Sequence, residues 1–593
     1  MTDSSTALNP FQREPRPRGL SRWLPGVQVL RGYQSSWLAK DIFAGLLLTA
    51  ILVPVGMGNA QASGLPAIYG LYATIVPLVA YAIFGPSRIL VLGPDSSLAP
   101  IIAATIVPLA AGNPDRLAPL AGMLALLTGG LCLLAGVARF GFVTELLSKP
   151  IRVGYLNGIA LTVMISQLPK LLGFPAEGGN LVQQTVNLAQ GIASGATNPA
   201  TLAIGVACLL IIFAFKRWQP KIPGVLVAVV GATLVTGSLN LAATAGVSVV
   251  GPLPQGLPAF QIPSVPRDDL GTLFLGALTI ALVSFAGTSV LSRTFALRGG
   301  YEIDEDQELV ALGVADVTAG LFQGFPISSS YSRTPVAEAA GAKTQVTGVV
   351  GALCIALLLI LAPDLLQNLP NAALGAIVIA AVSSLIDITA VRHFYHLRRS
   401  EFGLSMICFL GVALIGVIQG MGIAIGLALL AFIWKAWRPY DAVLGRVDGL
   451  KGYHDVTRHP EAKRIPGLVL FRWDAPLFFA NADTFYEHVL KAVADAPTPT
   501  NWVVIAAEPV SDIDITAADV LSKLDDDLQR VDIQLCFAEL KGPAKDRLKQ
   551  YGLFHKLGNG LFFRTIGQAV DGYLKAHPVE WRDWEDELRE NQV

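Results

Sequence analysis

Two stretches of sequence decide the fold of this chain: Leu92-Gly93-Pro94-Asp95-Ser96-Ser97 and Phe325-Pro326-Ile327-Ser328-Ser329-Ser330. Each places a proline just before a cluster of small hydroxyl side chains. An apolar run begins at each hydroxyl cluster, at residues 95–111 and 328–340. Both runs are shorter than the roughly 20 residues that a membrane-spanning helix needs. Short, proline-interrupted segments at matching positions of two halves are typical of a transporter's binding site.

The physical reason lies at the ends of the broken helices. A helix that starts inside the membrane presents unpaired N–H groups and the positive end of its dipole. Two such starts that face each other form an anion site in the middle of the bilayer. The alternative interpretation is that the prolines and serines only kink packed helices.

Composition places the chain in a membrane. Of its 593 residues, 53% are hydrophobic and 15% are charged, whereas a soluble domain has about 25% charged residues. The net charge of −1 gives no reason to expect a nucleic-acid partner. The five cysteines are scattered without a CxxC pair, so no disulfide framework, metal site or cofactor is expected. The polar, basic N-terminus does not resemble a signal peptide.

Apolar runs predict fourteen spanning segments, seven in each half of a polytopic α-helical membrane protein. The predicted spans are 42–60, 67–84, 95–111, 117–138, 146–168, 198–216, 221–240, 271–295, 307–323, 328–340, 345–362, 370–387, 402–418 and 420–437. The two short segments are the third span of each group of seven.

The positions of the basic residues support this count. Lys and Arg collect in cytoplasmic loops, and here they collect in the loops that follow even-numbered spans. These residues are Arg88, Arg139, Lys216, Arg217, Lys221, Arg293, Arg298, Lys343, Arg392, Arg398 and Arg399. Both termini are therefore predicted to be cytoplasmic.

After residue 438 charged residues become frequent, and short apolar runs alternate with helical stretches. The predicted strands are Gly467–Arg472, Pro476–Phe479, Trp502–Ala507 and Ile533–Ala538. The predicted helices are 483–494, Thr516–Leu528, 543–550 and 566–575. This alternation indicates a small α/β domain.

These motifs resemble the SulP family of anion permeases, and residues 450–580 resemble the STAS domain. The residues that carry the resemblance are Pro54, Gly56-Met57, Gly64–Tyr72, Phe84–Arg88, Val91–Pro94, Gln307–Leu309, Ala311–Gly313, Phe325-Pro326, Tyr331–Thr334, Ala340–Gln345, Val510–Asp514 and Thr516–Asp519. The resemblance implies a seven-plus-seven inverted repeat. Spans 1–4 and 8–11 would form a core, and spans 5–7 and 12–14 would form a gate. The core would carry the anion past the gate in an elevator-like movement, and family members often form homodimers.

The resemblance also implies the site. The start of span 10 would supply Ser329, Ser330, Ser332 and Arg333, and the start of span 3 would supply Asp95, Ser96 and Ser97. An arginine always carries its charge and binds oxyanions in a forked geometry. A structural ion pair is the alternative role for Arg333.

The sequence departs from the family pattern at several site positions. Val55 stands where many members have Gln, and Asn59 stands where an aromatic is usual. Many bacterial members carry a coupling carboxylate in span 8, where this chain has Gly287, followed by Thr288. Asp95 stands where an apolar or small residue is usual.

Asp95 therefore has three open interpretations. It would replace the missing coupling carboxylate and carry a proton with the anion, form a permanent ion pair with Arg333, or cap span 3. Near the inner end of span 5, Glu145 and Lys149 either line the path or form a solvated helix end, the more ordinary role.

In the STAS domain, Asp514 and Thr516 match the loop whose Ser or Thr is phosphorylated in soluble relatives. A phosphate there would place negative charge at a helix start. The more ordinary role for Thr516 is that of the N-cap.

The sequence predicts a secondary active anion transporter in the inner membrane and not an enzyme. Sulfate, carried with a proton, is the expected substrate. Bicarbonate, chloride, a dicarboxylate or an anion channel regulated by the STAS domain remain alternatives, and lipid surrounds the spans. The predicted domains are a cytosolic tail (1–40), a transport domain (41–438, with repeats 41–240 and 267–438), the STAS domain (450–580) and a C-terminal tail (581–593).

Overall fold

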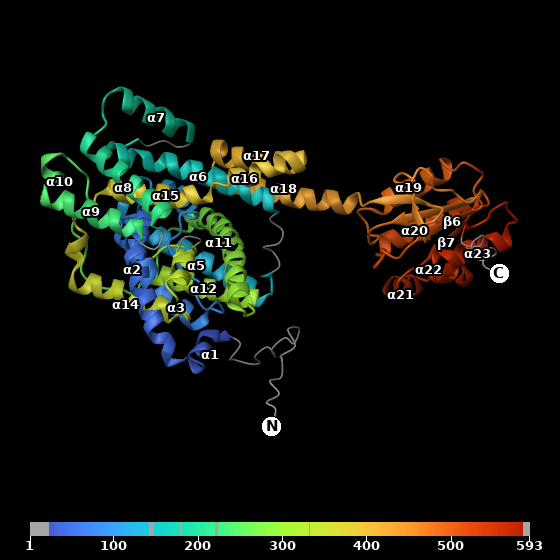
Figure 1. Cartoon of the computed structure of the whole chain (residues 1–593), viewed down its shortest axis with the longest axis horizontal. Helices are drawn as coiled ribbons and strands as arrows, with labels where there is room; N and C mark the ends of the chain where they lie inside the picture. The colour runs from blue at the N-terminus through green and yellow to red at the C-terminus, as the bar shows by residue number, and fades with distance from the viewer. Residues whose placement is uncertain (1–22, 142–147, 177–180, 220–222, 331–332, 585–593) are drawn as a thin grey trace. The chain divides into compact units, whose positions relative to one another are not determined.

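The computed structural model describes residues 23–141, 148–176, 181–219, 223–330 and 333–584 (Figure 1). The chain divides into two compact units, residues 1–428 and 429–593. The first is helical, and the second is an α/β domain.

Helices occupy all fourteen predicted ranges. Those of the first half are α2 (Ser35–Ala62), α3 (Ile68–Phe84), α4 (Ala99–Ala110), α5 (Leu117–Val137), α6 (Lys149–Leu172), α8 (Pro199–Trp218) and α9 (Gly224–Ser238). Those of the second half are α11 (Leu270–Gly299), α12 (Glu305–Leu321), α13 (Arg333–Ala339), α14 (Val346–Leu361), α15 (Asn371–Val382), α17 (Arg399–Leu410), continued by a π-helix (Gly411–Ile415), and α18 (Val417–Trp437). Four further helices are α1 (Pro25–Arg31), α7 (Leu181–Ala193), α10 (Leu241–Thr244) and α16 (Ile388–Leu397).

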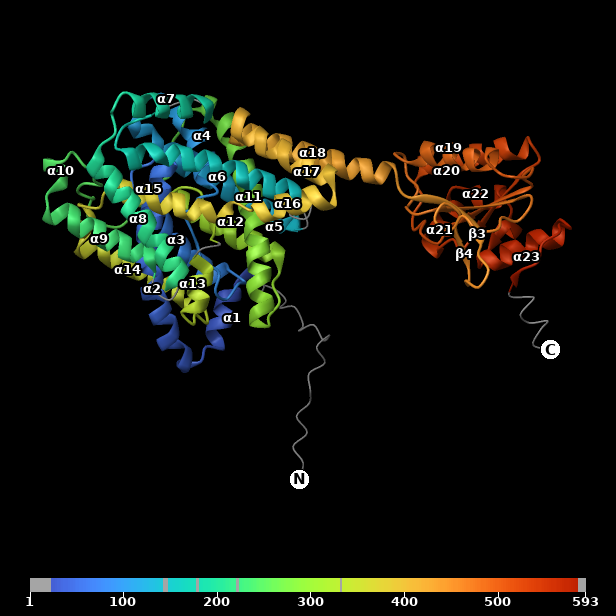
Figure 2. The ribbon, with the colours of Figure 1, turned by 45° about the horizontal axis from the view of Figure 1, so that its top comes forward.

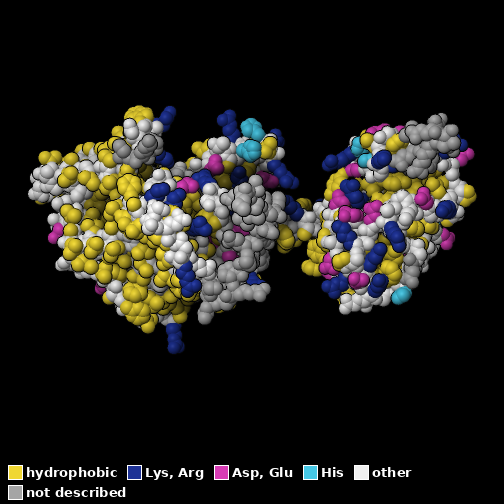
Figure 3. Space-filling view, turned by 60° about the horizontal axis from the view of Figure 1, so that its bottom comes forward, with side chains coloured by type: hydrophobic (Ala, Val, Ile, Leu, Met, Phe, Trp, Pro, Cys, Tyr) yellow, Lys and Arg dark blue, Asp and Glu magenta, His cyan; other side chains and the backbone are white. Residues whose placement is uncertain are grey.

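Several helices are suited to a bilayer by length and composition. Within the described ranges, seven helical segments are long and apolar enough to cross a membrane on their own, and four shorter apolar helices accompany them. Large apolar side chains such as Leu134, Leu210 and Leu361 are mostly exposed. Figure 3 shows hydrophobic side chains spread over the visible face of the helical unit, as expected of a surface that contacts lipid.

The two short spans differ from the ranges predicted for them. Helix α4 begins only at Ala99, and α13 begins at Arg333. Residues before each helix form the short strands β1 (Leu92–Gly93) and β2 (Ser328–Ser329) instead. The reason is tertiary, because these two strands pair with each other and so satisfy backbone groups that a helix would otherwise pair.

Helix packing repeats in the two halves. Helix α2 packs on α14 as α11 packs on α5, and α3 packs on α14 as α12 packs on α5. A second group follows the same rule, since α6 packs on α17 as α15 packs on α8. Helices α6, α8 and α15 lie side by side in Figures 1 and 2. An odd number of spans per half makes this an inverted repeat, as predicted.

The α/β domain is built on one six-stranded sheet with the order β4-β3-β5-β6-β7-β8. The strands are β3 (Asp441–Arg446), β4 (Tyr453–Asp455), β5 (Leu468–Trp473), β6 (Trp502–Ala506), β7 (Gln534–Ala538) and β8 (Phe562–Phe563). The helices are α19 (Ala482–Ala494), α20 (Ile515–Gln529), α21 (Gly542–Gln550), α22 (Leu553–Lys556) and α23 (Ile566–Ala576). Helices α19 to α22 pack on one face of the sheet and α23 on the other, because alternate strand residues point to opposite faces.

One strand predicted in this domain is wrong. Residues Pro476–Phe479 form no strand, and only Leu477 makes an isolated parallel bridge, to Ile513. The chain turns immediately afterwards, where the N–H of Phe478 donates to Asn481 Oδ1. A short apolar run does not reveal that its backbone pairs at a single residue.

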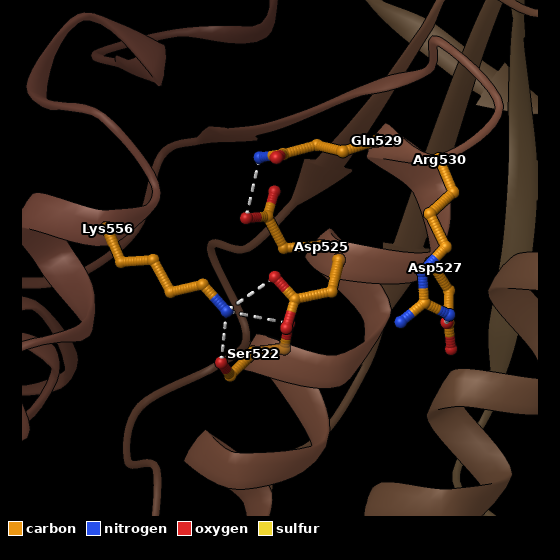
Figure 4. A network of polar contacts seen from close by, with 7 residues as sticks. Ser522, Asp525, Asp527, Gln529, Arg530 and Lys556 are labelled. Carbon is orange, nitrogen blue, oxygen red and sulfur yellow. Dashed lines mark hydrogen bonds and ion pairs between the residues drawn. The ribbon is translucent and has the colours of Figure 1, made fainter.

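A polar network joins α20 to α22 (Figure 4). Lys556 Nζ donates to Ser522 Oγ at 2.6 Å and forms an ion pair with Asp526 at 2.7 Å. Asp525 accepts a hydrogen bond from Gln529, and burial raises the pKa of its carboxyl group. The network ties the short helix α22 to the body of the domain.

Candidate functional site

The two interrupted segments meet as an antiparallel strand pair. Leu92 pairs with Ser329 and Gly93 with Ser328. The Ser330 N–H donates to the Val91 carbonyl at 3.1 Å. These contacts bring together the two sequence stretches that were predicted to face each other.

Asp95 caps the turn that leads into α4. Its Oδ1 accepts hydrogen bonds from the backbone N–H of Ser97 at 2.9 Å and from Ser97 Oγ at 2.5 Å. Ser96, next to it, is buried. Of the three roles considered for Asp95, capping is the one with direct contacts. The same hydrogen bonds leave Oδ2 without a hydrogen-bond donor in the described part of the chain.

A small cavity lies beside the strand pair. Its lining combines residues of both halves: Ser97, Ile151, Arg152, Tyr155, Leu156, Val283, Ala286, Gly287, Ser328, Ser329, Leu385 and Ala424. Its volume of about 40 Å³ is enough for a few water molecules or one small anion. Ser97, Ser329 and Gly287 were predicted as site residues, and the structure brings them together here.

Arg333 is fully buried and does not line the cavity. Its guanidinium lies against Gly93, where an added Cβ would be 3.2 Å from Nη1. Within the described ranges none of its three side-chain nitrogens has a hydrogen-bond partner, and no carboxylate, Asp95 included, is within ion-pair distance. An unpaired buried cation gives the strand pair a positive field.

Other predicted residues support the strands rather than line the cavity. Asn59 Nδ2 donates to the Pro94 carbonyl at 2.9 Å. Thr288 Oγ1 donates to Ser329 Oγ at 3.0 Å. Val55 is a buried residue of α2.

Of the remaining predicted residues, some are described by the structure and others are not. Ser330 Oγ accepts from the N–H of Arg333 at 3.3 Å. Ser332 lies outside the described residues, and so does Glu145. Lys149 is exposed at the start of α6, as expected of a solvated helix end.

Sequence reasoning missed Arg152, Tyr155 and Asp316. Arg152 and Tyr155 line the cavity from α6. Asp316 is fully buried on α12, and its Oδ1 accepts from the N–H of Ile327 at 2.8 Å, directly before β2. A charged residue inside a predicted span was the available signal for Arg152 and Asp316.

In the α/β domain Asp514, not Thr516, is the N-cap of α20. Its Oδ1 accepts from the N–H of Ala517 and its Oδ2 accepts from the N–H of Phe479, both at 2.8 Å. The prediction that Thr516 caps the helix is wrong, because the helix begins one residue earlier than expected. The Thr516 side chain is exposed in the first turn.

Comparison with known proteins identifies both units. Residues 38–408 match the model of the sulfate permease family, and residues 459–569 match the model of the STAS domain. A probable sulfate transporter of Mycobacterium tuberculosis is 40% identical over 553 residues, covering 93% of this chain and 98% of that protein.

Solved structures share the fold. The inward-facing murine solute carrier 26 family member A9, an anion transporter, superposes with a TM-score of 0.87 at 22% identity, covering 96% of this chain and 97% of that one. The transmembrane domain of a cyanobacterial bicarbonate transporter matches 67% of this chain and 98% of its own length, with a TM-score of 0.57 at 22% identity. The chain therefore belongs to the sulfate permease family of membrane transporters and carries a STAS domain.

Proposed function

We propose that this protein is a secondary active transporter of sulfate that moves a proton with the anion. The observation that carries the proposal is Arg333, a fully buried guanidinium with no hydrogen-bond partner within the described ranges. A buried cation that no protein group hydrogen-bonds is costly, and a bound anion removes that cost. A neutral substrate such as a nucleobase would leave the charge of Arg333 uncompensated.

One of the hydroxyl groups that line the cavity suits an oxyanion. Ser329 Oγ accepts a hydrogen bond from Thr288 and, among the described residues, keeps its own O–H for an anion. The O–H groups of Ser97 and Ser328 are donated to Asp95 and to the Ser284 carbonyl. The family and the 40% identical relative, which is named a probable sulfate transporter, support sulfate as the substrate.

The proposed movement follows from the two packing groups. The proposed core, helices α2–α5 and α11–α14, would carry the strand pair, and α6, α8, α9, α15, α17 and α18 would form the gate. Contacts of α6 with α17 and α15, and of α8 with α15 and α9, support this division. In an elevator-like movement the core slides along the gate and exposes the cavity to each side in turn. The same proposal divides the chain into a tail (1–40), a transport domain (41–438), a STAS domain (450–580) and a C-terminal tail (581–593).

We assign the protein to the inner membrane as a homodimer with both termini in the cytoplasm, and we assign it no catalytic activity. The STAS domain would regulate transport. Thr516, exposed in the first turn of α20 beside the cap residue Asp514, is the proposed regulatory position.

Asp95 is the proposed proton carrier. Its Oδ1 accepts hydrogen bonds from Ser97, and Oδ2, to which no described residue donates, would take the proton. Protonation removes a negative charge next to the anion site, so that anion and proton bind together.

The test is uptake of labelled sulfate into proteoliposomes with and without an inward proton gradient. Wild-type protein should show saturable uptake that the gradient accelerates. Asp95→Asn keeps an acceptor for the Ser97 hydrogen bonds but cannot titrate, so its uptake should no longer respond to the gradient. Asp115→Asn, an exposed position, is the matched control and should behave as wild type.

Two outcomes would contradict the proposal separately. Full dependence on the gradient in Asp95→Asn would leave Asp95 as a cap alone. Uptake of bicarbonate, chloride or a dicarboxylate without uptake of sulfate would reject the substrate, and large unsaturable fluxes would indicate a channel.

A further inference from the structure

Arg152 brings a second positive charge to the cavity. It lies in the first turn of α6, and its half-buried side chain lines the cavity together with Ser97, Ser328 and Ser329. Arg333 lies against Gly93 of the same strand pair and is not among the residues that line the cavity.

The guanidinium of Arg152 makes no hydrogen bond or ion pair with any residue in the described part of the chain. An arginine that faces a space inside a membrane protein usually pairs with an acid or marks the path of a substrate. Here the lining of the space beside it, though largely apolar, includes the Ser329 hydroxyl, which can donate to an anion. Its planar fork fits the oxygen atoms of an oxyanion.

Arg152 and the serines belong to different packing groups. Helix α6 packs mainly on α8, α15 and α17, whereas the strand pair is held by α3, α11 and their neighbours. The cavity wall that carries Arg152 is therefore the gate wall. An anion in the cavity would lie beside Arg152 and beside the strand pair that Arg333 contacts at Gly93.

We infer that Arg152 is a specificity-determining residue that makes the site prefer doubly charged oxyanions over singly charged ones. The inference rests on the proposed function, since it takes the cavity as the substrate site. The energy of a charge–charge contact is proportional to the charge of the ligand. The gain from Arg152 is thus about twice as large for a dianion as for a monoanion.

The experiment is direct binding of labelled sulfate, labelled oxalate and labelled chloride to purified full-length protein in detergent. In Arg152→Gln we expect the dissociation constant for both dianions to rise about 10-fold and that for chloride about 3-fold. The lost binding energy is proportional to the ligand charge, so the change in the logarithm of the dissociation constant is half as large for chloride. Arg152→Lys keeps the charge and should retain most of the dianion preference.

Lys149→Gln is the matched control. It removes one positive charge from the same helix, one turn earlier, at an exposed position that does not line the cavity, and it should leave all three constants unchanged. Size-exclusion profiles of all variants check folding. If Arg152→Gln is not monodisperse, Arg152→Met, which also removes the charge, takes its place with the same expected changes.

Equal changes for dianions and chloride, or no change at all, would overturn the inference. Loss of binding in Lys149→Gln equal to that in Arg152→Gln would do the same, since it would reveal a general charge effect. If wild-type protein binds oxalate but not sulfate, the proposed substrate fails, while oxalate and chloride still test the role of Arg152.

Discussion

At the residue scale, Asp41 shows how this fold satisfies a buried carboxylate. It lies on α2 with no exposed surface. Its Oδ1 accepts from the N–H groups of Lys343 and Thr344, and its Oδ2 accepts from Thr344 Oγ1 at 2.7 Å. Thr347 and Tyr33 donate as well. Arg333 is the opposite case, because its buried charge has no such partners among the described residues.

Asp41→Ala should strongly destabilise the protein. The substitution leaves several buried donors without an acceptor, at a cost of about 3 kcal/mol or more. Asp41→Asn keeps one acceptor oxygen and should fall between Asp41→Ala and wild type. Thermal unfolding in detergent measures the effect, with the exposed Asp115→Ala as control. An unchanged unfolding temperature in Asp41→Ala would mean that water replaces the carboxylate.

At the element scale, glycines let α5 and α12 approach closely. A Cβ on Gly129 would lie 2.6 Å from the Gly313 carbonyl oxygen, and a Cβ on Gly313 would lie 2.8 Å from the Gly129 carbonyl oxygen. Gly122 and Gly320 make the same reciprocal contact about two helical turns away along the two helices. Small residues at such positions are the usual means of close helix packing in membranes.

Gly129→Leu should therefore force α5 and α12 apart. Overpacking in a well-packed core costs about 1–3 kcal/mol, and here the obstacle is backbone, so the upper end of that range is expected. Gly130→Leu, one residue along, places a side chain where nothing lies within 4 Å and should be tolerated. Yield and unfolding temperature of the purified proteins compare the two. Equal stability would show that the helices can separate without loss.

At the scale of the whole molecule, the proposed substrate site belongs to one unit. The cavity-lining residues run from Ser97 to Ala424, within residues 1–428. The α/β domain has hydrophobic cores of its own. Binding of the anion should thus be independent of the second unit, whatever that unit does to the rate of transport.

A chain that ends after Arg438 should bind sulfate with a dissociation constant within about twofold of the full-length value, because distant parts of a protein contribute nearly additively. Direct binding of labelled sulfate measures this. Arg333→Gln in the same shortened chain is the control and should reduce binding to background. Loss of binding by a monodisperse shortened chain would show that the STAS domain helps to form the site.

The sequence by itself determined the helical membrane fold, the break in each half and most elements of the α/β domain. Apolar length, proline and the spacing of charges are local properties that act before any tertiary contact forms. They predicted helices in all fourteen ranges, together with the interruptions at Pro94 and Pro326. The strand prediction at Pro476–Phe479 was wrong because a run of four apolar residues does not determine which backbone groups it pairs with.

Only the tertiary structure decided which polar groups meet. The pairing of Gly93 with Ser328 joins residues far apart in sequence. Packing of α6 in the fold places Arg152 on the cavity wall, and packing of α12 buries Asp316 where it accepts a hydrogen bond from Ile327. Hydropathy reveals that a helix lies in the membrane. The direction in which each of its side chains points is set by long-range packing, which the local pattern does not contain.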